Sequence, residues 1–383
     1  MAVRTARVGA VGLVAAAALT AASFTSPAAA GGSVGHTQTQ QAMDAAVKAG
    51  VPGVAGQVKE AVSVWPGSSG VGNLKTGQPR SAFDRYRIGS MTKTFVSTVL
   101  LQLEAEGKLD LDDTVEKWLP GVVQGNGNDG SRISVRQLLN HTSGIFNYVT
   151  DPEFLENGFT KKFLEHRYDT YTPAQLVGIA MRHQPSFEPG SNWGYSNTNY
   201  ALAGMVIEKV TGRSYEDEVQ QRIVGPLGLT ATTVPRTASA MPQPSSRAYS
   251  KLSLQPQPSD PTYDVTELNP SAAGSAGAMI SDSGDLNRFY SALLGGKLLP
   301  AEQLKEMKTT VPVSGAPFSG YGLGLMKFDL SCGTSVWGHG GNIQGSASQA
   351  VTTPDGKHGL AFNFNGDWAG DTQSVIEAEY CPK

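Results

Sequence analysis

The pattern of apolar and polar positions divides the chain into strand-like ends and a helical middle. Residues 42–60 predict an opening helix, and residues 61–88 are strand-like around a glycine-rich turn. A long apolar run with helical spacing covers residues 90–106 and ends at a glycine. Residues 109–224 are typical of helices joined by loops.

The second half of the chain returns to strands. Residues 233–262 are rich in Pro, Ser and Gln and predict an irregular excursion. A helix is expected across residues 286–294, and another just before Cys381. Residues 321–365 alternate and carry many glycines, which favours antiparallel strands.

This order predicts an α+β fold, in which an antiparallel sheet flanked by helices is built from both chain ends around an inserted, mostly helical part. The sheet part is expected at about residues 36–95 and 270–383, and the helical part at about residues 96–269.

The first 30 residues predict a secretory signal peptide. Arg4 and Arg7 form a basic start, residues 8–24 are apolar and uncharged, and small residues precede a cleavage site after Ala30. The apolar run is rich in Ala and Gly, which favours a signal peptide over a membrane anchor. We expect a secreted protein, extracellular or in the cell envelope, whose mature domain is residues 31–383.

Composition narrows the function classes. The chain has 30 basic and 33 acidic residues, and loss of Arg4 and Arg7 leaves 28 against 33, a formal charge of −5. Nothing in this balance favours nucleic acid as a partner. The two cysteines, Cys332 and Cys381, favour a disulfide in an exported chain, stabilising it by about 2–4 kcal/mol. Two buried free thiols are the alternative.

Two motifs that suggest ligand sites lack the required context. The segment "GNGNDG" at residues 125–130 has dinucleotide-loop spacing, but a strand before it and a helix after it are missing, so a loop is expected. The histidines are scattered, and two thiols are too few for a structural zinc. We therefore expect neither a metal nor a cofactor.

The segment "GSMTKTF" places Ser90 and Lys93 at the start of the long apolar helix. A separation of three residues puts both side chains on one helix face. A serine hydroxyl is a weak nucleophile that needs a neighbouring base, and Ser-x-x-Lys is an acyl-transfer signature. The alternative is a capping serine with a solvated lysine, which the apolar surroundings of Lys93 disfavour.

Two later segments add candidate residues. "YSNTNY" supplies Tyr195 and Asn197, and a tyrosine can act as a base if cationic neighbours such as Lys93 lower its pKa. "WGHGGNIQG" supplies His339, Gly340 and Gly341, whose glycines let backbone approach a ligand closely. A packed tyrosine and a glycine-rich bulge are the structural alternatives.

Together and in this order, the three motifs resemble the serine β-lactamase and D-alanyl-D-alanine carboxypeptidase superfamily. The Tyr-x-Asn form resembles its class C branch, which includes secreted DD-peptidases. The segments "LLQLEAEGKLDLDD", "LLNHTSG", "YSNTNYALAGMVIEKVTG" and "YGLGL" are also similar to family segments. "DLSCG" shortly before His339, with a cysteine close to the C-terminus, is similar to secreted DD-carboxypeptidases.

The resemblance implies a role for each matching residue. Ser90 would be the acylated nucleophile, with Lys93 beside it to help remove its proton. Tyr195 would pass that proton to the leaving group and later activate water. Asn197 would bind Lys93 and the substrate, and His339 would line the pocket and influence Tyr195. Whether Lys93 or Tyr195 is the base stays open, and the pair is expected to titrate as a coupled unit.

The resemblance also implies an oxyanion hole made of the backbone N–H groups of Ser90 and Asn342. His141, in "LLNHTSG", is a candidate for the histidine of a catalytic triad. Family members carry that motif structurally, so we expect a structural role for His141.

The sequence departs from the carboxypeptidase pattern where such enzymes hold the free carboxylate of the substrate. Met326 occupies the position where an arginine is usual, and Gly340 and Asn342 stand where threonines are common. Ala272 replaces a frequent aromatic pocket residue, and Lys327 is expected on the other strand face. With Gly341, these residues are the candidate substrate contacts. The carboxylate clamp therefore looks missing.

The expected function is a serine hydrolase of the D-alanyl-D-alanine carboxypeptidase type acting through an acyl-enzyme on Ser90. An esterase, an amidase or a D-aminopeptidase-like hydrolase without the clamp is a close alternative, and a non-catalytic binding protein is another. Expected partners are a peptide or other acyl substrate, with a peptidoglycan stem peptide as one candidate and β-lactams as acylating ligands. A monomer is expected.

Overall fold

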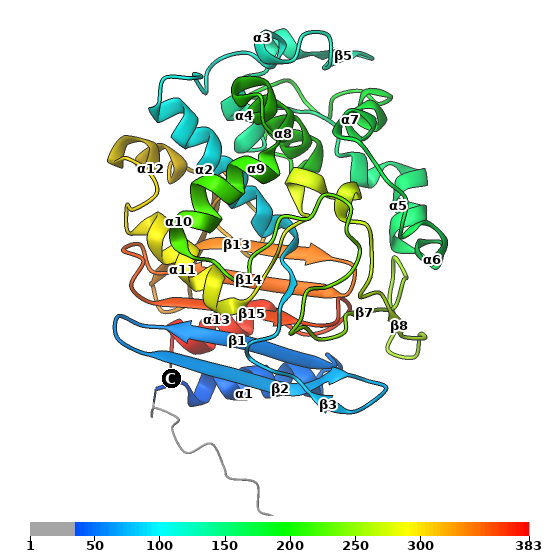
Figure 1. Ribbon diagram of the computed structural model, residues 1–383, viewed down its shortest axis with the longest axis vertical. Coiled ribbons are helices and arrows are strands. Elements are labelled where there is room, and N and C mark those ends of the chain that lie inside the picture. The colour runs from blue at the N-terminus through cyan, green and yellow to red at the C-terminus, as the bar shows by residue number, and fades with distance from the viewer. Residues whose placement is uncertain (1–34, 383) are drawn as a thin grey trace, which may run out of the picture.

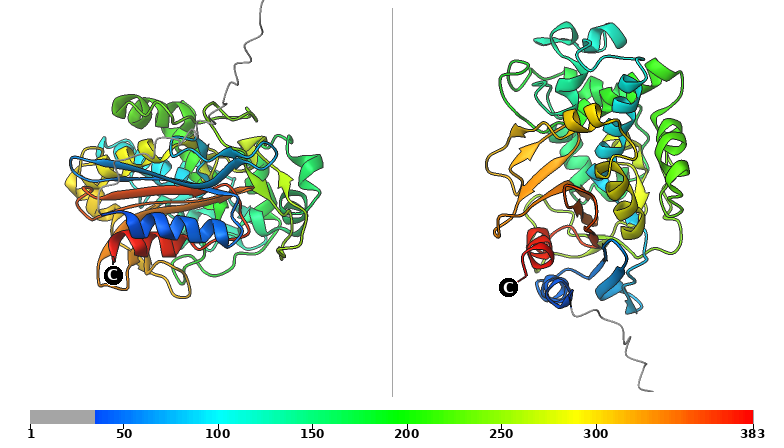
Figure 2. Two further views of the ribbon diagram at one scale, coloured as in Figure 1. Left: turned by 90° about the horizontal axis from the view of Figure 1, so that it is seen from below. Right: turned by 90° about the vertical axis from the view of Figure 1, so that its left-hand side faces the viewer.

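The computed structural model describes residues 35–382, so the predicted signal peptide lies outside the described residues. A nine-stranded antiparallel sheet lies between two layers of helices (Figure 1). The α+β fold class predicted from the sequence is confirmed. Helices α1 (Thr37–Lys48) and α13 (Thr372–Tyr380) lie side by side on one face of the sheet (Figure 2).

The large sheet joins the two ends of the chain. Its strand order is β10-β11-β12-β13-β14-β15-β1-β2-β3, and the first and last long strands pair with Val54 opposite Phe364. Its strands are β1 (Gly53–Lys59), β2 (Val64–Asn73), β3 (Gln78–Pro79), β10 (Val311–Pro312), β11 (Gly320–Tyr321), β12 (Met326–Asp329), β13 (Ser335–Ile343), β14 (Ser346–Thr352) and β15 (Gly359–Phe364).

Three short strand pairs lie outside this sheet. They are β4 (Tyr86–Arg87) with β9 (Ile280–Ser281), β5 (Gln124–Gly125) with β6 (Asn128–Asp129), and β7 (Tyr249–Ser250) with β8 (Tyr263–Asp264). The β5–β6 pair shows that the "GNGNDG" segment is a hairpin loop, as its missing strand–helix context predicts.

The second face of the sheet is covered by helices from the middle of the chain, with α11 packed on β14, β15 and β1. These helices are α2 (Thr92–Ala105), α3 (Val115–Trp118), α4 (Val135–Leu139), α5 (Pro152–Phe159), α6 (Phe163–His166), α7 (Pro173–Met181), α8 (Asn197–Thr211), α9 (Tyr215–Val219), α10 (Gly225–Leu227), α11 (Ser283–Leu294) and α12 (Ala301–Met307).

The opening helix predicted at residues 42–60 is wrong in its second half. Helix α1 ends at Lys48, and β1 follows from Gly53. Six of the seven residues of β1 are buried because helices cover both faces of the sheet, so the strand lacks the alternation that identifies a half-exposed strand. A Cβ on Gly56 would lie 2.7 Å from Met43 Cε, so this glycine lets α1 pack directly on the strand.

Helix α2 forms the centre of the larger core. Its residues from Thr92 to Leu101 are all buried, as expected of a helix surrounded by other elements. Phe95 stacks on Phe289 of α11 with ring centroids 3.7 Å apart. Because α2 is fixed on all sides, the residues at its N-terminus have a rigid support.

A buried carboxylate ties the N-terminal and C-terminal helices together. Glu379 of α13 accepts hydrogen bonds from Thr39 Oγ1 at 2.6 Å and from His358 Nε2 at 2.7 Å, and its oxygens lie 3.1 Å from His36 Nδ1. Side chains that are distant in sequence thus stabilise the face of the sheet opposite to α2.

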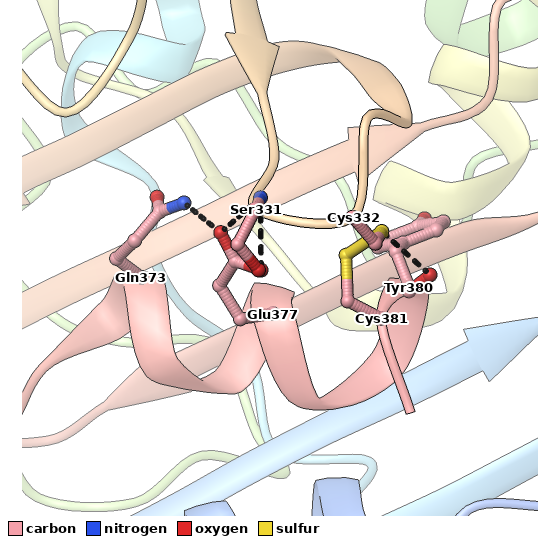
Figure 3. The surroundings of a disulfide bond; sticks show 6 residues. All are labelled: Ser331, Cys332, Gln373, Glu377, Tyr380 and Cys381. Carbon is pink, nitrogen blue, oxygen red and sulfur yellow. Dashed lines mark hydrogen bonds between the residues drawn. A yellow bond between two sulfur atoms is a disulfide. The ribbon is translucent and has the colours of Figure 1, made fainter. Parts of the chain in front are cut away.

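The two cysteines form a disulfide that joins the loop after β12 to the end of α13 (Figure 3). Beside it, Glu377 accepts hydrogen bonds from the backbone N–H of Ser331 at 3.1 Å and from its hydroxyl at 2.6 Å. Both contacts attach α13 to the edge of the sheet.

The predicted irregular excursion at residues 233–262 contains only the short strand β7. Leu252, from this excursion, packs with Phe163 and Leu268 in a small separate core. The excursion therefore contributes apolar contacts to the segments that contain Phe163 and Leu268. No helix among residues 35–382 is long and apolar enough to cross a membrane.

Candidate active site

Ser90 lies in a 3-10 turn, Gly89–Met91, that leads directly into α2. Gly89 has a φ of +50°, a left-handed conformation that glycine adopts without a steric penalty. The turn therefore bends the chain from β4 into the buried helix and presents the Ser90 side chain at the helix start.

Lys93 is fully buried and has three polar neighbours. Its Nζ lies 3.0 Å from Ser90 Oγ, and it donates hydrogen bonds to Asn197 Oδ1 and to the backbone oxygen of Ala276, both at 2.7 Å. The last two neighbours only accept. A neutral amine uses its two N–H groups on them and leaves its lone pair for the Ser90 hydroxyl.

The protonation of the site follows from its burial. Burial lowers the pKa of Lys93 well below its usual value, which favours the neutral amine. Burial raises the pKa of the Tyr195 phenol, and a hydrogen bond with Ser90 only partly opposes this shift. The expectation that a charged Lys93 lowers the pKa of Tyr195 finds no support in these shifts, because burial disfavours the charged form of both groups.

His141 fixes the position of Tyr195. Its backbone oxygen accepts from the N–H of Gly194 at 3.0 Å, and its ring Nδ1 accepts from the N–H of Ser196 at 3.3 Å, so it holds both neighbours of Tyr195. The two rings pack with centroids 4.3 Å apart. A second donor to Nδ1, the Asn199 amide at 3.1 Å, places the ring proton on Nε2.

This geometry supports the structural role expected for His141. Burial lowers its pKa well below the usual value, so the ring is neutral. Neither ring nitrogen has a hydrogen bond to Ser90, and Nε2 is without a partner in the described part of the chain.

His339 contacts Tyr195 only indirectly. Its Nε2 lies 2.9 Å from the hydroxyl of Tyr321, and its Nδ1 donates to Gly340 O at 2.6 Å. Burial lowers the pKa of His339 to about 3, so the ring is neutral at physiological pH. Tyr321 then packs edge-on against Tyr195 with centroids 6.1 Å apart. The predicted influence of His339 on Tyr195 therefore passes through Tyr321.

The backbone of β13 lies directly against the Ser90 turn. A Cβ on Gly89 would lie 2.9 Å from Asn342 N, and a Cβ on Gly341 would lie 3.3 Å from Ser90 N and 1.9 Å from Ile88 O. The two N–H groups implied as an oxyanion hole are thus brought together by glycines on both segments. The same contacts show that the Cα of Gly341 faces the turn, and its contact with substrate stays a prediction.

A cavity of about 560 Å³ opens onto these residues. It brings together the predicted Ser90, Tyr195, Asn197, Ala272, Met326, His339, Gly340 and Asn342, whereas Lys93 and Gly341 do not line it. Lys327 pairs with Asp329 and also lies outside it.

The sequence did not reveal most of the cavity wall. Aromatic side chains from α5, α6, strand β12, a 3-10 turn and several loops dominate it, namely Tyr148, Phe154, Phe159, Phe163, Tyr171, Trp193, Phe318 and Phe328. Only Trp193 carries a local signal, because it lies two residues before Tyr195. Such a wall suits a substrate with a large apolar group.

The site shows no arrangement for a metal. Within residues 35–382, no group of three or more His, Cys, Asp or Glu side chains is placed to hold a metal ion.

Comparison with known families agrees with this geometry. A sequence profile of the family described as Beta-lactamase matches residues 37–375. The chain belongs to the β-lactamase family. It is a hydrolase of the serine β-lactamase fold.

Two curated relatives match part of the chain. Penicillin-binding protein 4* of Bacillus subtilis (strain 168) is 32% identical over 170 residues, which are 44% of this chain and 34% of that protein. Protein flp of Staphylococcus aureus (strain NCTC 8325 / PS 47) is 34% identical over 153 residues, 40% of this chain and 28% of that protein. The matched part spans about a third of these longer relatives.

Two solved structures match nearly the whole chain. A D-stereospecific amidohydrolase from Streptomyces sp. is 61% identical with a TM-score of 0.87, over 91% of this chain and 99% of that chain. The D-amino acid amidase from Ochrobactrum anthropi SV3, complexed with L-phenylalanine amide, is 29% identical with a TM-score of 0.76, over 89% and 97%.

Proposed function

We propose that the protein is a secreted serine hydrolase that cleaves amides and esters of D-amino acids through an acyl-enzyme on Ser90. The observation that carries the catalytic part is the buried Lys93 amine, which lies 3.0 Å from Ser90 Oγ and whose pKa burial lowers well below its usual value. A neutral amine at this distance can take the serine proton directly.

The proposed route has two steps. Ser90 Oγ attacks the substrate carbonyl carbon while its proton moves to Lys93 Nζ, and the Ser90 and Asn342 N–H groups bind the oxyanion. The carbonyl re-forms as the leaving nitrogen takes a proton from the Tyr195 hydroxyl, and the Lys93 ammonium returns a proton to Tyr195. Water then attacks the carbonyl carbon of the acyl-enzyme and gives a proton to the same pair of residues. The pair passes this proton to Ser90 Oγ as the bond between the acyl carbon and Oγ breaks, which releases the acid and restores Ser90.

The wall of the cavity and the relatives favour an amidase over a carboxypeptidase. Met326, where carboxypeptidases of this branch usually have an arginine, lines the cavity and cannot bind a carboxylate. Two of the solved structures that match nearly the whole chain are named a D-stereospecific amidohydrolase and a D-amino acid amidase. The alternative raised by the sequence is therefore better supported than D-alanyl-D-alanine carboxypeptidase activity, which was expected first.

The test compares three substrates on the purified mature protein. We expect D-phenylalaninamide to be hydrolysed at least about a hundredfold faster, in kcat/KM, than L-phenylalaninamide, a transition-state difference of about 2.7 kcal/mol. An acylated peptide ending in D-Ala-D-Ala should be the poorest substrate, because its carboxylate lies two bonds from the scissile nitrogen, where Met326 offers no cation. The reverse order would establish the carboxypeptidase.

The catalytic assignment has its own control. Ser90→Ala should lose turnover of every substrate while its thermal unfolding stays close to that of the wild type. An acylating β-lactam or fluorophosphonate probe should label the wild type on Ser90 and leave the variant unlabelled. Absence of labelling and of turnover in the wild type would indicate a non-catalytic binding protein.

A further inference from the structure

One charged group on the cavity wall has no counter-charge. Arg167, at the C-terminal end of α6, lines the same cavity as Ser90 and Tyr195. Among residues 35–382, no carboxylate oxygen lies within 4.0 Å of its nitrogens, whereas most arginines of the chain have such a partner. An arginine that faces a cavity without an anion is a candidate binding group.

The hydrogen bonding of Arg167 is also incomplete. Its Nη1 donates to the backbone oxygen of Asp264 at 3.3 Å, and its Nε is buried without any partner in the described chain. The guanidinium lies over the Tyr168 ring, 5.0 Å from the centroid, and 5.9 Å from that of Phe163. These rings hold the guanidinium plane in place without satisfying its donors.

A second guanidinium adds to the positive potential at this wall. Arg87 is buried, and its pKa is lowered to about 10, first by burial and then by the charge of the neighbouring Arg167. Its Nη2 donates to Leu268 O at 3.2 Å and to other backbone oxygens, while Nε and Nη1 have no partner in the part of the chain that the structure describes. Arg87 likewise has no ion-pair partner there.

The acidic groups nearby are engaged elsewhere. Asp169, which also lines the cavity, lies 2.8 Å from His166 Nδ1. Glu267 accepts from the Tyr168 hydroxyl at 3.4 Å and is outside ion-pair distance of both arginines. The other wall residues are largely apolar, so water screens an added charge poorly and a charge-assisted bond gains strength.

We propose that Arg167 binds a carboxylate of the substrate inside this cavity, and that the enzyme therefore prefers acyl compounds with an acidic group. The planar guanidinium suits a carboxylate, and its Nη2 makes no hydrogen bond within residues 35–382. This site differs from the carboxypeptidase clamp, whose usual position holds Met326 on β12. The inference rests on the proposed function, because it names the substrates of the same cavity.

Two matched pairs of probes locate the carboxylate. D-glutamyl and D-glutaminyl 4-nitroanilide differ in the acyl group, and D-phenylalanyl 4-aminobenzoate and 4-aminobenzamide differ in the leaving group. Affinities are measured by calorimetry on Ser90→Ala, which cannot turn the probes over. In at least one of the two pairs, we expect the probe that carries the carboxylate to bind at least about tenfold more tightly than its neutral partner.

Adding Arg167→Gln to Ser90→Ala should remove that preference. Adding Arg236→Gln should preserve it, because Arg236 is exposed, pairs with Asp217 at 2.8 Å and lies outside the cavity. Equal affinity within both pairs, or a preference that survives Arg167→Gln, would overturn the proposal. Binding of inorganic phosphate that depends on Arg167, without a preference for either acid, would also overturn it.

Failure of the proposed function would look different. Turnover of the neutral probes by the wild type tests the hydrolase activity and does not involve a carboxylate. Binding to Ser90→Ala tests Arg167 and does not require turnover. Each result can therefore fail without the other.

Discussion

The contact between β13 and the Ser90 turn makes Gly341 the most sensitive backbone position of the site. In Gly341→Ala the new Cβ would lie 1.9 Å from Ile88 O, and real Cβ atoms essentially never come within 3.0 Å of another heavy atom. The turn or the strand must therefore retreat by about 1.1 Å. Neither is a flexible side chain, because both contacting segments are backbone.

The size of the effect follows from that displacement. A misplacement of about 1 Å between reacting groups can cost about a hundredfold in rate, and loss of one oxyanion donor costs about 10²–10³-fold. We therefore expect Gly341→Ala to lower kcat for D-phenylalaninamide by at least about a hundredfold, or about 2.7 kcal/mol.

Two other glycines provide graded controls. A Cβ on Gly340 would meet only the movable end of the Gln349 side chain, at 2.9 Å, so Gly340→Ala should lose much less activity. A Cβ on Gly178, in α7, would meet nothing within 4 Å, so Gly178→Ala should keep activity and gain about 0.5–1 kcal/mol.

The assay measures steady-state kinetics and thermal unfolding on all three variants. If Gly341→Ala keeps activity within a few-fold of the wild type, the close contact does not set the position of the oxyanion donors. Equal losses in Gly340→Ala and Gly341→Ala would equally refute the reasoning.

Four further changes test other parts of the structure. In the wild type, the free energy of unfolding should rise as the pH increases from the lowered pKa of Lys93 toward 10.5, because the unfolded lysine still binds a proton that the folded one has lost. Lys93→Met should lack this rise. If urea denaturation gives the same pH dependence of stability for the wild type and Lys93→Met, the reasoning is contradicted. His141→Ala should lower kcat far more than it changes KM, since Ser196 loses its Nδ1 acceptor and Tyr195 loses the ring that packs against it, while the backbone oxygen that binds Gly194 remains; a change in KM alone would contradict this positioning role. Glu379→Gln should lower the free energy of unfolding by about 2–3 kcal/mol without affecting kcat, because buried hydrogen bonds to a charged group are lost; an unchanged urea midpoint would contradict it. Cys332→Ser with Cys381→Ser should cost about 2–4 kcal/mol, and native protein whose intact mass shows two free thiols would exclude the disulfide.

Local spacing was enough to predict the nucleophile and its base. Ser90 and Lys93 lie three residues apart on one helix, so secondary structure alone brings them together. Tyr195 and Asn197 are about a hundred residues away, and only the family resemblance connected them to Lys93. The third partner of Lys93, Ala276 O, is a backbone atom and carries no sequence signal.

The cavity wall could not be predicted for a related reason. Phe154 and Phe159 of α5 are five residues apart and so about 140° apart around the helix, and only the packing of α5 shows that both reach the cavity. Arg167 lies in the polar segment "LEHRYD", which is typical of a solvated surface. Strand β1 was mistaken for a helix because burial on both faces removes its alternation.

The residues around Tyr195 share one property, which is that each contradicts a local rule of stable folding. Lys93 is buried without a carboxylate, and His141 has a φ of +62° that a residue with a Cβ seldom adopts. The Nε2–H of His141 is buried without a partner in the described chain. Such features persist only where the surrounding structure fixes them, and here the core around α2 does so. The cost is consistent with catalysis, because a solvated Lys93 would stay charged and could not accept the proton of Ser90.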